Sequence, residues 1–130
     1  MSAESACPCG SGRDYAACCG PIHAGEPAPT AEALMRSRFS AFALGDTAYL
    51  LHSWHPSTRP VDLEPDPDVV WRRLQLVDTV AGAPDDAEGI VEFRASYRGS
   101  DGAGVLHERS RFVRVEGRWV YLDGETPDSH

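Results

Sequence analysis

The hydrophobic positions of this 130-residue chain follow a helical period in the first half and an alternating period in the second. Between residues 31 and 44, apolar side chains recur every three to four positions, which predicts an amphipathic helix. Thr30 and Gly45 flank this segment, and these residue types commonly begin and end helices.

Two shorter helices are predicted after the first. Asp46 is a typical N-cap, and Pro56 would close a helix that runs through Trp54. Asp66-Pro67 is typical of a helix start and predicts a third, short helix. That helix would carry Val70, Trp71 and Leu74.

Alternating runs predict four strands, over residues 74–81, 89–98, 105–115 and 118–123. Loops rich in Gly, Asp and Pro separate the first three strands, and Glu116-Gly117 predicts a tight hairpin between the last two. Helices followed by an antiparallel sheet predict an α+β fold, in which the helices pack on one face of a curved sheet.

Successive side chains of a strand point to opposite faces of its sheet, so the alternation predicts which face the helices cover. The aromatic-rich set is the predicted inner face. It comprises Val91, Phe93, Ala95 and Tyr97, then Leu106, Glu108, Ser110 and Phe112, then Trp119, Tyr121 and Asp123. Val120 and Leu122 fall on the predicted outer face.

Two charged residues fall on surfaces that are predicted to be buried, Arg38 on the first helix and Glu108 on the inner sheet face. An unpaired buried charge is very costly. We therefore expect Arg38 and Glu108 to approach each other in the interior, with Ser110 or Tyr97 attached. Two interpretations stay open: an ion pair that anchors helix to sheet, or a polar cluster at the bottom of a ligand-binding cone.

The formal net charge is −8, and all twelve basic residues are arginines. This acidity argues against nucleic-acid binding, and the absence of lysine excludes Schiff-base chemistry. No apolar stretch approaches the ~20 residues of a membrane span, so no membrane association is predicted. No signal peptide is visible either, and we expect a cytoplasmic protein.

All four cysteines lie within thirteen positions, at Cys7, Cys9, Cys18 and Cys19. Zinc binds four thiolates in a tetrahedron, and the glycines between the second and third cysteines permit a tight chelating turn. Two disulfides are the alternative, but bridges persist mainly in oxidising compartments. We expect a closed zinc site, and leave open whether His23 replaces one cysteine.

The segment from Trp54 to Arg59 reads Trp-His-Pro-Ser-Thr-Arg. These side chains could bind an anion, with His55 as a general base. Helix capping and loop hydrogen bonds would explain the same residues without chemistry. The chain contains no phosphate-binding loop, nucleophile elbow or His-Glu-x-x-His motif.

Two sets of motifs resemble known families. Residues 7–20 read Cys-Pro-Cys-Gly-Ser-Gly-Arg-Asp-Tyr-Ala-Ala-Cys-Cys-Gly, which resembles the SEC-C motif, a short zinc-binding element of bacterial proteins. Arg-Ser-Arg-Phe-Ser-Ala-Phe (36–42), Trp-His-Pro-Ser-Thr-Arg (54–59), His-Glu-Arg-Ser-Arg-Phe (107–112) and Gly-Arg-Trp-Val-Tyr-Leu-Asp-Gly (117–124) resemble the YchJ-like family of uncharacterised bacterial proteins.

The second resemblance implies a domain organisation, a fold and a metal, but no reaction. It implies a SEC-C zinc element over residues 1–22, a linker over 23–29, a nuclear transport factor 2-like (cystatin-like) cone over 30–126 and a tail over 127–130.

Three functions are compatible with these features. The first is a binding protein, whose zinc element contacts another protein or whose cone holds a small molecule. The second is an enzyme of the hydrolase, isomerase or dehydratase type. Its pocket candidates are Arg38, His55, Tyr97, Glu108 and Asp123. The third is a homodimeric scaffold that associates through the outer sheet face.

Overall fold

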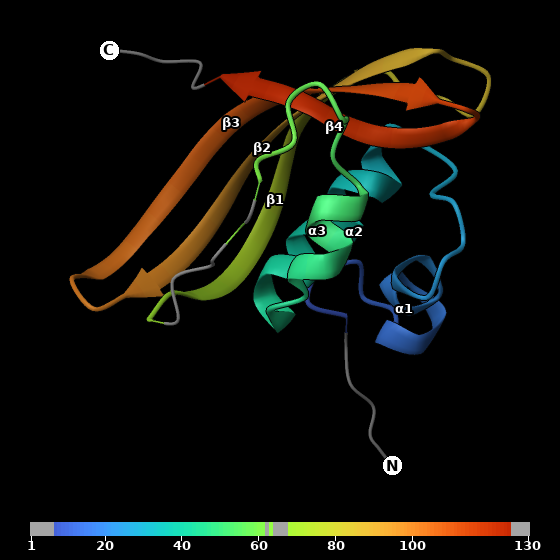
Figure 1. Ribbon diagram of the computed structural model, residues 1–130. Helices are drawn as coiled ribbons and strands as arrows, with labels where there is room; N and C mark the ends of the chain where they lie inside the picture. Colours follow the sequence, from blue (N-terminus) through green and yellow to red (C-terminus); the bar gives the residue numbers. More distant parts are fainter. Residues whose placement is uncertain (1–6, 62, 64–67, 126–130) are drawn as a thin grey trace.

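The structure is a computed structural model that describes residues 7–61, 63 and 68–125. Four antiparallel strands in the order β1-β2-β3-β4 form a curved sheet, and the helices lie against its concave side (Figure 1). The elements are a 3-10 turn η1 (Tyr15–Ala17), α1 (Cys19–His23), α2 (Ala31–Leu44), α3 (Thr47–His52), β1 (Val70–Ala81), β2 (Glu88–Gly99), β3 (Gly102–Val115) and β4 (Arg118–Glu125). The predicted α+β architecture is confirmed. None of the described helices is long and apolar enough to cross a membrane.

The caps predicted for the two main helices are present. The Thr30 side chain accepts a hydrogen bond from the Ala33 N–H at 3.0 Å, and Gly45 ends α2 with a φ of 76°. Asp46 caps α3 by accepting from the Tyr49 N–H at 3.1 Å. Helix α3 ends at His52, before the predicted end at Trp54, and the chain turns away at Ser53.

The prediction of a third helix over residues 70–74 was wrong, because these residues open strand β1. Trp71 pairs with Tyr97 and Leu74 with Ala95, with an irregularity in the register between Trp71 and Arg73. The extra residue in this β-bulge places Trp71 and Leu74, three positions apart, on the same face. Spacing by three is also the spacing of a helix, so the bulge produced a helical pattern in a strand. The predicted start at Asp66-Pro67 lies outside the described residues.

An irregularity in another strand pair changes the face of Asp123. In the β3–β4 pairing, Arg111 lies opposite Asp123 and Phe112 opposite Tyr121, so Leu122 is an extra residue. Beyond this point the alternation is reversed. Asp123 therefore joins Arg111 on the outer face, and the prediction that it shares the inner face was wrong.

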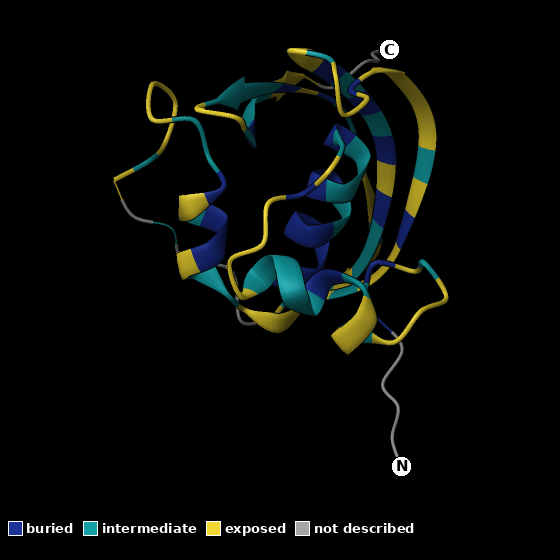
Figure 2. Cartoon of the chain, turned by 90° about the vertical axis from the view of Figure 1, so that its right-hand side faces the viewer, coloured by how far each residue is buried: buried dark blue, intermediate teal, exposed yellow. Residues whose placement is uncertain are grey.

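The core lies between α2 and the inner face of the sheet, and buried and exposed positions alternate along the strands (Figure 2). Its buried members are Ala28, Ala31, Leu34, Met35, Phe39, Leu74, Val91, Phe93, Ala95, Phe112 and Trp119. Trp119 and Phe112 are the largest of its fully buried side chains, at 1% and 0% exposure. Burial of each such side chain stabilises the fold by about 1.5–3 kcal/mol. The helix that carries one half of this core also supports the cysteine-rich segment.

Candidate metal centre and ligand cavity

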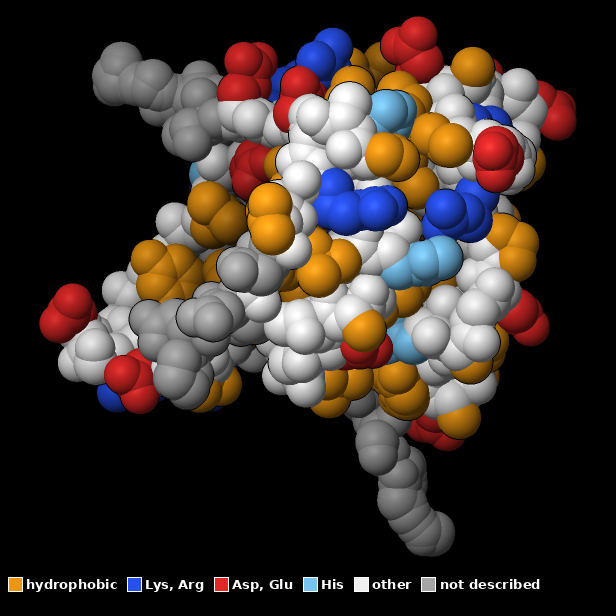
Figure 3. Space-filling view, viewed as in Figure 1, with side chains coloured by type: hydrophobic (Ala, Val, Ile, Leu, Met, Phe, Trp, Pro, Cys, Tyr) orange, Lys and Arg blue, Asp and Glu red, His pale blue; other side chains and the backbone are white. Residues whose placement is uncertain are grey.

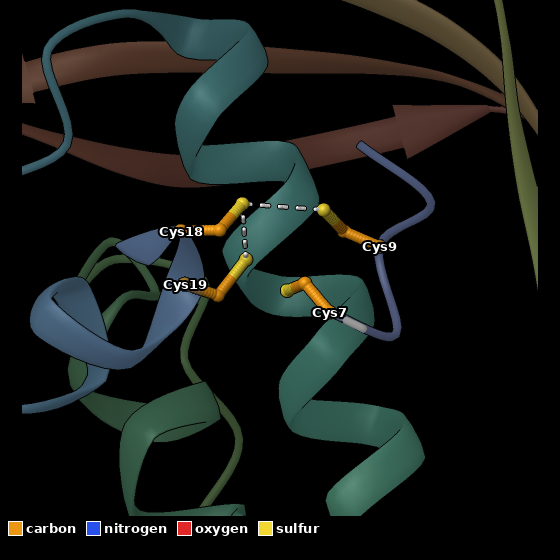
Figure 4. A group of neighbouring side chains, drawn as sticks. All are labelled: Cys7, Cys9, Cys18 and Cys19. Carbon is orange, nitrogen blue, oxygen red and sulfur yellow. Dashed lines mark hydrogen bonds between the residues drawn. The ribbon is translucent and has the colours of Figure 1, made fainter. Parts of the chain in front are cut away.

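The four cysteines come together on the surface of α2 (Figure 4). Their Sγ atoms all lie within 4.8 Å of one another, with Cys9 and Cys18 3.6 Å apart and Cys18 and Cys19 3.9 Å apart. The first two ligands and the last two are joined by a turn in which Gly10 has a φ of 82°. This left-handed conformation suits glycine, because it has no Cβ.

The sulfur spacing fits a tetrahedral metal site. Four Zn–S bonds of ~2.3 Å would place the sulfurs about 3.8 Å apart at the corners of a tetrahedron. A disulfide requires about 2.05 Å between the sulfurs. All four cysteines are free thiols, three of them buried and Cys18 partly exposed. The cluster is therefore arranged to hold one metal ion in a closed four-sulfur site, and is not a pair of disulfides.

Polar groups of α2 and of the chelating turn hold the sulfurs in place. Ser40, which is fully buried, donates to the Cys19 Sγ at 3.3 Å and lies 3.4 Å from the Cys7 Sγ. The Ser11 hydroxyl lies 3.1 Å from the Cys18 Sγ. Such partners outside the ligand set orient the ligands and usually raise metal affinity.

Without a metal ion, the pKa values of two of the thiols are shifted in opposite directions. Hydrogen bonding with the Cys19 thiol, against the opposing effect of burial, lowers the pKa of Cys9 to about 4. The same interaction, together with burial, raises the pKa of Cys19. A bound cation would replace these shared protons, because thiolates are the form that binds metal.

His23 is not a member of the cysteine cluster. Its Nε2 donates to the Ser37 carbonyl at 2.8 Å, which leaves Nδ1 to accept from the Tyr15 hydroxyl at 2.6 Å. Both ring nitrogens are therefore engaged, and the histidine connects η1 to α2. Among the described residues, the group that could hold a metal ion therefore consists of the four cysteines, without His23.

A cavity of about 270 Å³ lies between α2 and the inner face of the sheet. Its wall is mostly aromatic and aliphatic, with four polar side chains. The lining residues are Met35, Arg38, Phe39, Phe42, Trp54, Trp71, Phe93, Ala95, Leu106, Glu108, Ser110 and Tyr121. A concave, mostly apolar site with a few polar groups is typical of a small-molecule site.

Arg38 is buried in this cavity at 4% exposure. Its Nη1 donates to the Leu50 carbonyl at 3.0 Å and to the Ser53 hydroxyl at 2.7 Å. The guanidinium carbon lies 4.5 Å from the ring centre of Tyr121 and 4.9 Å from that of Trp54. Burial lowers the pKa of Arg38 to about 10, so it still carries its positive charge at neutral pH.

Glu108 lines the same cavity, but no direct ion pair with Arg38 is found among the described residues. Its Oε2 accepts from the Tyr121 hydroxyl at 3.0 Å and from the Ser110 hydroxyl at 3.2 Å. The expected attachment of Ser110 is confirmed, whereas Tyr121 takes the place expected of Tyr97. Burial, and then the charge of Glu108, raise the pKa of Tyr121.

The absence of a side chain at Gly124 leaves room for the Glu108 carboxylate. A Cβ at position 124 would overlap with Oε2 of Glu108. We expect Gly124→Ala to displace this carboxylate and to lower the free energy of unfolding by about 1–3 kcal/mol. Gly99→Ala is the control, because a Cβ at position 99 would lie 3.8 Å from Cγ2 of Val69, which is a normal van der Waals distance. Urea denaturation of both variants measures the difference, and equal losses would contradict the role of Gly124.

The other three candidate pocket residues lie outside the cavity lining. Tyr97 packs against Trp71 at 5.3 Å between ring centres and is not a lining residue. Asp123 accepts two hydrogen bonds from Arg111 on the outer face, at 2.7 and 2.6 Å. The Nδ1 of His55 accepts from the N–H and hydroxyl of Ser57, at 3.0 and 2.8 Å. His55 thus stabilises a local turn after α3.

Basic side chains gather next to this turn. Arginine and histidine side chains lie side by side over α3 and β4 (Figure 3). The Nη1 of Arg118 lies 2.9 Å from the Nε2 of His52, and Arg59 donates to the Trp54 carbonyl at 2.9 Å. Burial, and then the charges of Arg118 and Arg59, lower the pKa of His52.

The outer face of the sheet is lined by charged pairs. His107 and Arg109 both donate to Glu92, at 2.7 and 2.9 Å. Val120, which falls on the predicted outer face, is only 1% exposed. Val120 itself therefore offers no surface for association.

The sequence did not identify two residues of this region, one that holds Arg38 and one in the cavity wall. Ser53 was treated as part of a helix, although it accepts the hydrogen bond from Arg38 and its own hydroxyl donates to the Leu50 carbonyl at 3.1 Å. Trp71 was placed in a helix and lies in the cavity wall. A signal for Ser53 was available, because a serine just before a predicted helix end often caps or bridges.

The comparisons with known proteins agree with this architecture. Residues 30–124 match the family model described as the YchJ, middle NTF2-like domain, and residues 5–21 match that of the SEC-C motif. A UPF0225 protein of Streptomyces coelicolor is 56% identical over 123 residues, which cover 94% of this chain and 96% of that protein. A UPF0225 protein of Corynebacterium efficiens is 50% identical, with 94% of each chain covered.

Two solved structures are also similar. The solution structure of a SEC-C motif containing protein from Rhodopseudomonas palustris has a TM-score of 0.81 and 34% identity, and covers 94% of this chain and 98% of its own. The crystal structure of a SEC-C motif containing protein from Psychrobacter arcticus has a TM-score of 0.75 and 28% identity, and covers 95% of this chain and 84% of its own.

Proposed function

Because the chain belongs to the YchJ-like (UPF0225) family, which joins a SEC-C motif to an NTF2-like domain, we propose that it is a zinc-stabilised protein that binds a small molecule. The ligand site is the cavity between α2 and the sheet. The observation that carries this proposal is the buried guanidinium of Arg38, placed in an otherwise mostly apolar cavity. A charge in such a position is costly, and it is commonly retained where it binds a ligand.

The choice of zinc follows from the ligand set. Four thiolates in a closed tetrahedron favour zinc, and iron is the main competitor for the same geometry. A closed site leaves no coordination position for a substrate, so the ion has a structural role. It stabilises the segment that packs on α2, and the opposite side of α2 carries Met35, Arg38, Phe39 and Phe42 of the cavity wall.

The cavity favours binding over catalysis. The only histidine considered as a general base, His55, is held in a turn and does not line the cavity. The aromatic side chains that do line it offer packing surface, and Arg38 and Glu108 offer hydrogen bonds. These are the properties of a site that holds a molecule and fixes its orientation.

A fragment library screened against the full-length, metal-loaded protein by ligand-observed NMR tests the proposal. Leu106 lines the cavity and is 37% exposed, so Leu106→Trp should obstruct the cavity where it meets solvent. We expect fragments that bind the wild type, and whose affinity falls more than tenfold in Leu106→Trp. Saturating ligand at about 100 times its dissociation constant would stabilise the wild type by about 2.7 kcal/mol.

The neighbouring residue provides the matched control. Val105 is 59% exposed and points to the opposite face of the same strand, so Val105→Trp adds the same indole away from the cavity. The affinity of Val105→Trp for the fragments should equal that of the wild type. A library without any fragment sensitive to Leu106→Trp would overturn the proposed function.

A further inference from the structure

The polar groups left free in the cavity restrict the chemistry of its ligand, and this inference rests on the proposed function. The first of these groups is a donor. Only Nη1 of Arg38 is engaged, and the described residues offer no acceptor to its Nε or Nη2. Within the same part of the chain, the buried indole Nε1 of Trp54 also has no hydrogen-bond partner. The ligand should therefore carry a hydrogen-bond acceptor.

The second free group is an acceptor. Both hydrogen bonds to the Glu108 carboxylate end on Oε2, from Ser110 and from Tyr121. No described residue donates to Oε1. A ligand that also carries an N–H or O–H donor would satisfy this oxygen, and leaving a polar group of a partly buried site unsatisfied is unfavourable.

The charges in the cavity wall cancel. Arg38 contributes one positive charge and Glu108 one negative charge, and both side chains line the same space. An anionic ligand attracted by Arg38 would be repelled by Glu108, and a cationic ligand would meet the reverse. Interactions between charges at short distance are strong in a medium of low dielectric constant. A ligand without net charge avoids both penalties.

The volume of the cavity and its aromatic wall restrict the size and shape of the ligand. A cavity of about 270 Å³ is slightly smaller than most small-molecule sites, which begin at about 300 Å³. Six aromatic residues line it: Phe39, Phe42, Trp54, Trp71, Phe93 and Tyr121. The Trp71 ring meets Phe39 and Phe42 at tilted or edge-on angles of 73° and 56°. A flat ring packs well against such a wall.

We propose that the cavity binds an uncharged, planar molecule of about one ring that carries an acceptor and a donor side by side, as in a primary carboxamide or a lactam. The carbonyl oxygen accepts from Arg38, and the amide N–H donates to Oε1 of Glu108. The ring occupies the aromatic part of the cavity.

Three probes of nearly the same shape test the ligand class on the full-length, metal-loaded protein. Benzamide carries the acceptor and the donor, benzoate carries acceptors and a negative charge, and toluene carries neither. Isothermal titration or NMR titration should show that benzamide binds the wild type at least tenfold more tightly than benzoate or toluene. Loss of benzamide binding in Leu106→Trp would place it in the cavity.

Glu108→Gln tests whether Glu108 contacts the ligand, because a residue with only a structural role would not change which probe binds more tightly. This change removes the negative charge and leaves Arg38 as the only charge in the wall. We expect the preference to reverse, with at least a tenfold gain in the affinity for benzoate relative to benzamide. Glu92→Gln, on the outer face, is the matched control and should leave the preference of the wild type unchanged.

The outcomes separate the ligand class from the proposed function. If benzoate or toluene binds the wild-type cavity as tightly as benzamide, or if Glu108→Gln leaves the preference unchanged, the carboxamide class is wrong and ligand binding stands. If none of the three probes binds, the carboxamide class is also wrong. Fragments of another chemistry that are sensitive to Leu106→Trp would then preserve the proposed function.

Discussion

Replacing Cys9 with serine is expected to abolish binding of the metal ion and to lower the free energy of unfolding by about 4–5 kcal/mol or more, as the loss of a structural metal does. Cys9 is fully buried and lies 3.6 Å from the Cys18 Sγ, so its replacement removes one corner of the tetrahedron. The remaining cysteines then no longer hold η1 and α1 on the surface of α2. Elemental analysis should give one zinc per wild-type chain and well under one for Cys9→Ser, and thermal denaturation should report the loss of stability.

Ser40→Ala is the matched control for this experiment. It removes the hydroxyl that donates to Cys19 and leaves all four sulfurs in place. We expect it to keep one zinc per chain, with an affinity reduced about 10- to 100-fold. A Cys9→Ser variant that retains a full equivalent of metal and the melting temperature of the wild type would refute the four-sulfur site.

Arg38→Met is expected to lower the free energy of unfolding by about 3–5 kcal/mol. The change removes the positive charge of Arg38 and leaves the negative charge of Glu108 in the cavity wall uncompensated. The Leu50 carbonyl and the Ser53 hydroxyl would each lose the guanidinium donor. Glu108 would keep its negative charge without a neighbouring cation. Arg94→Met, at an exposed position of the outer face, should change the stability by no more than about 0.5 kcal/mol.

The double variant Arg38→Met/Glu108→Gln tests the reason for this loss. Once Arg38 is absent, removal of the Glu108 charge should recover part of the stability. Denaturant unfolding of the four proteins should therefore give a coupling free energy of about 0.5–3 kcal/mol. Strict additivity of the two single losses would show that the cation and the carboxylate do not interact across the cavity.

The parts of the structure that could be predicted from the sequence are those set by local chemistry. The helix over 31–44 was predicted by its apolar spacing and its two caps, and the structure places both caps as expected. The meeting of the four cysteines followed from their spacing and from the glycines of the turn. Strand β2 was predicted closely because it alternates regularly from Glu88 to Gly99.

The parts that were not predicted depend on irregularities in strand pairing. Extra residues near Trp71 and at Leu122 change which side chains share a face, and only the partner strand reveals them. The partner of Arg38 was also misjudged. A buried cation was assumed to require a carboxylate, whereas main-chain carbonyl, hydroxyl and aromatic rings surround it here.

The open sheet has two outer edges, and each is protected from unwanted pairing with other chains in a different way. Along β1, two interruptions of the register break the row of free N–H and C=O groups, and Arg72, Arg73 and Asp78 are exposed there. Charges and bulges at an edge strand oppose aggregation through added strands. At the other edge, the chain after α3 covers β4, with hydrogen bonds from the Tyr121 N–H to Ser53 and from the His55 N–H to Tyr121, at 2.8 and 2.7 Å. The sheet is thus terminated at both sides by features of its own chain.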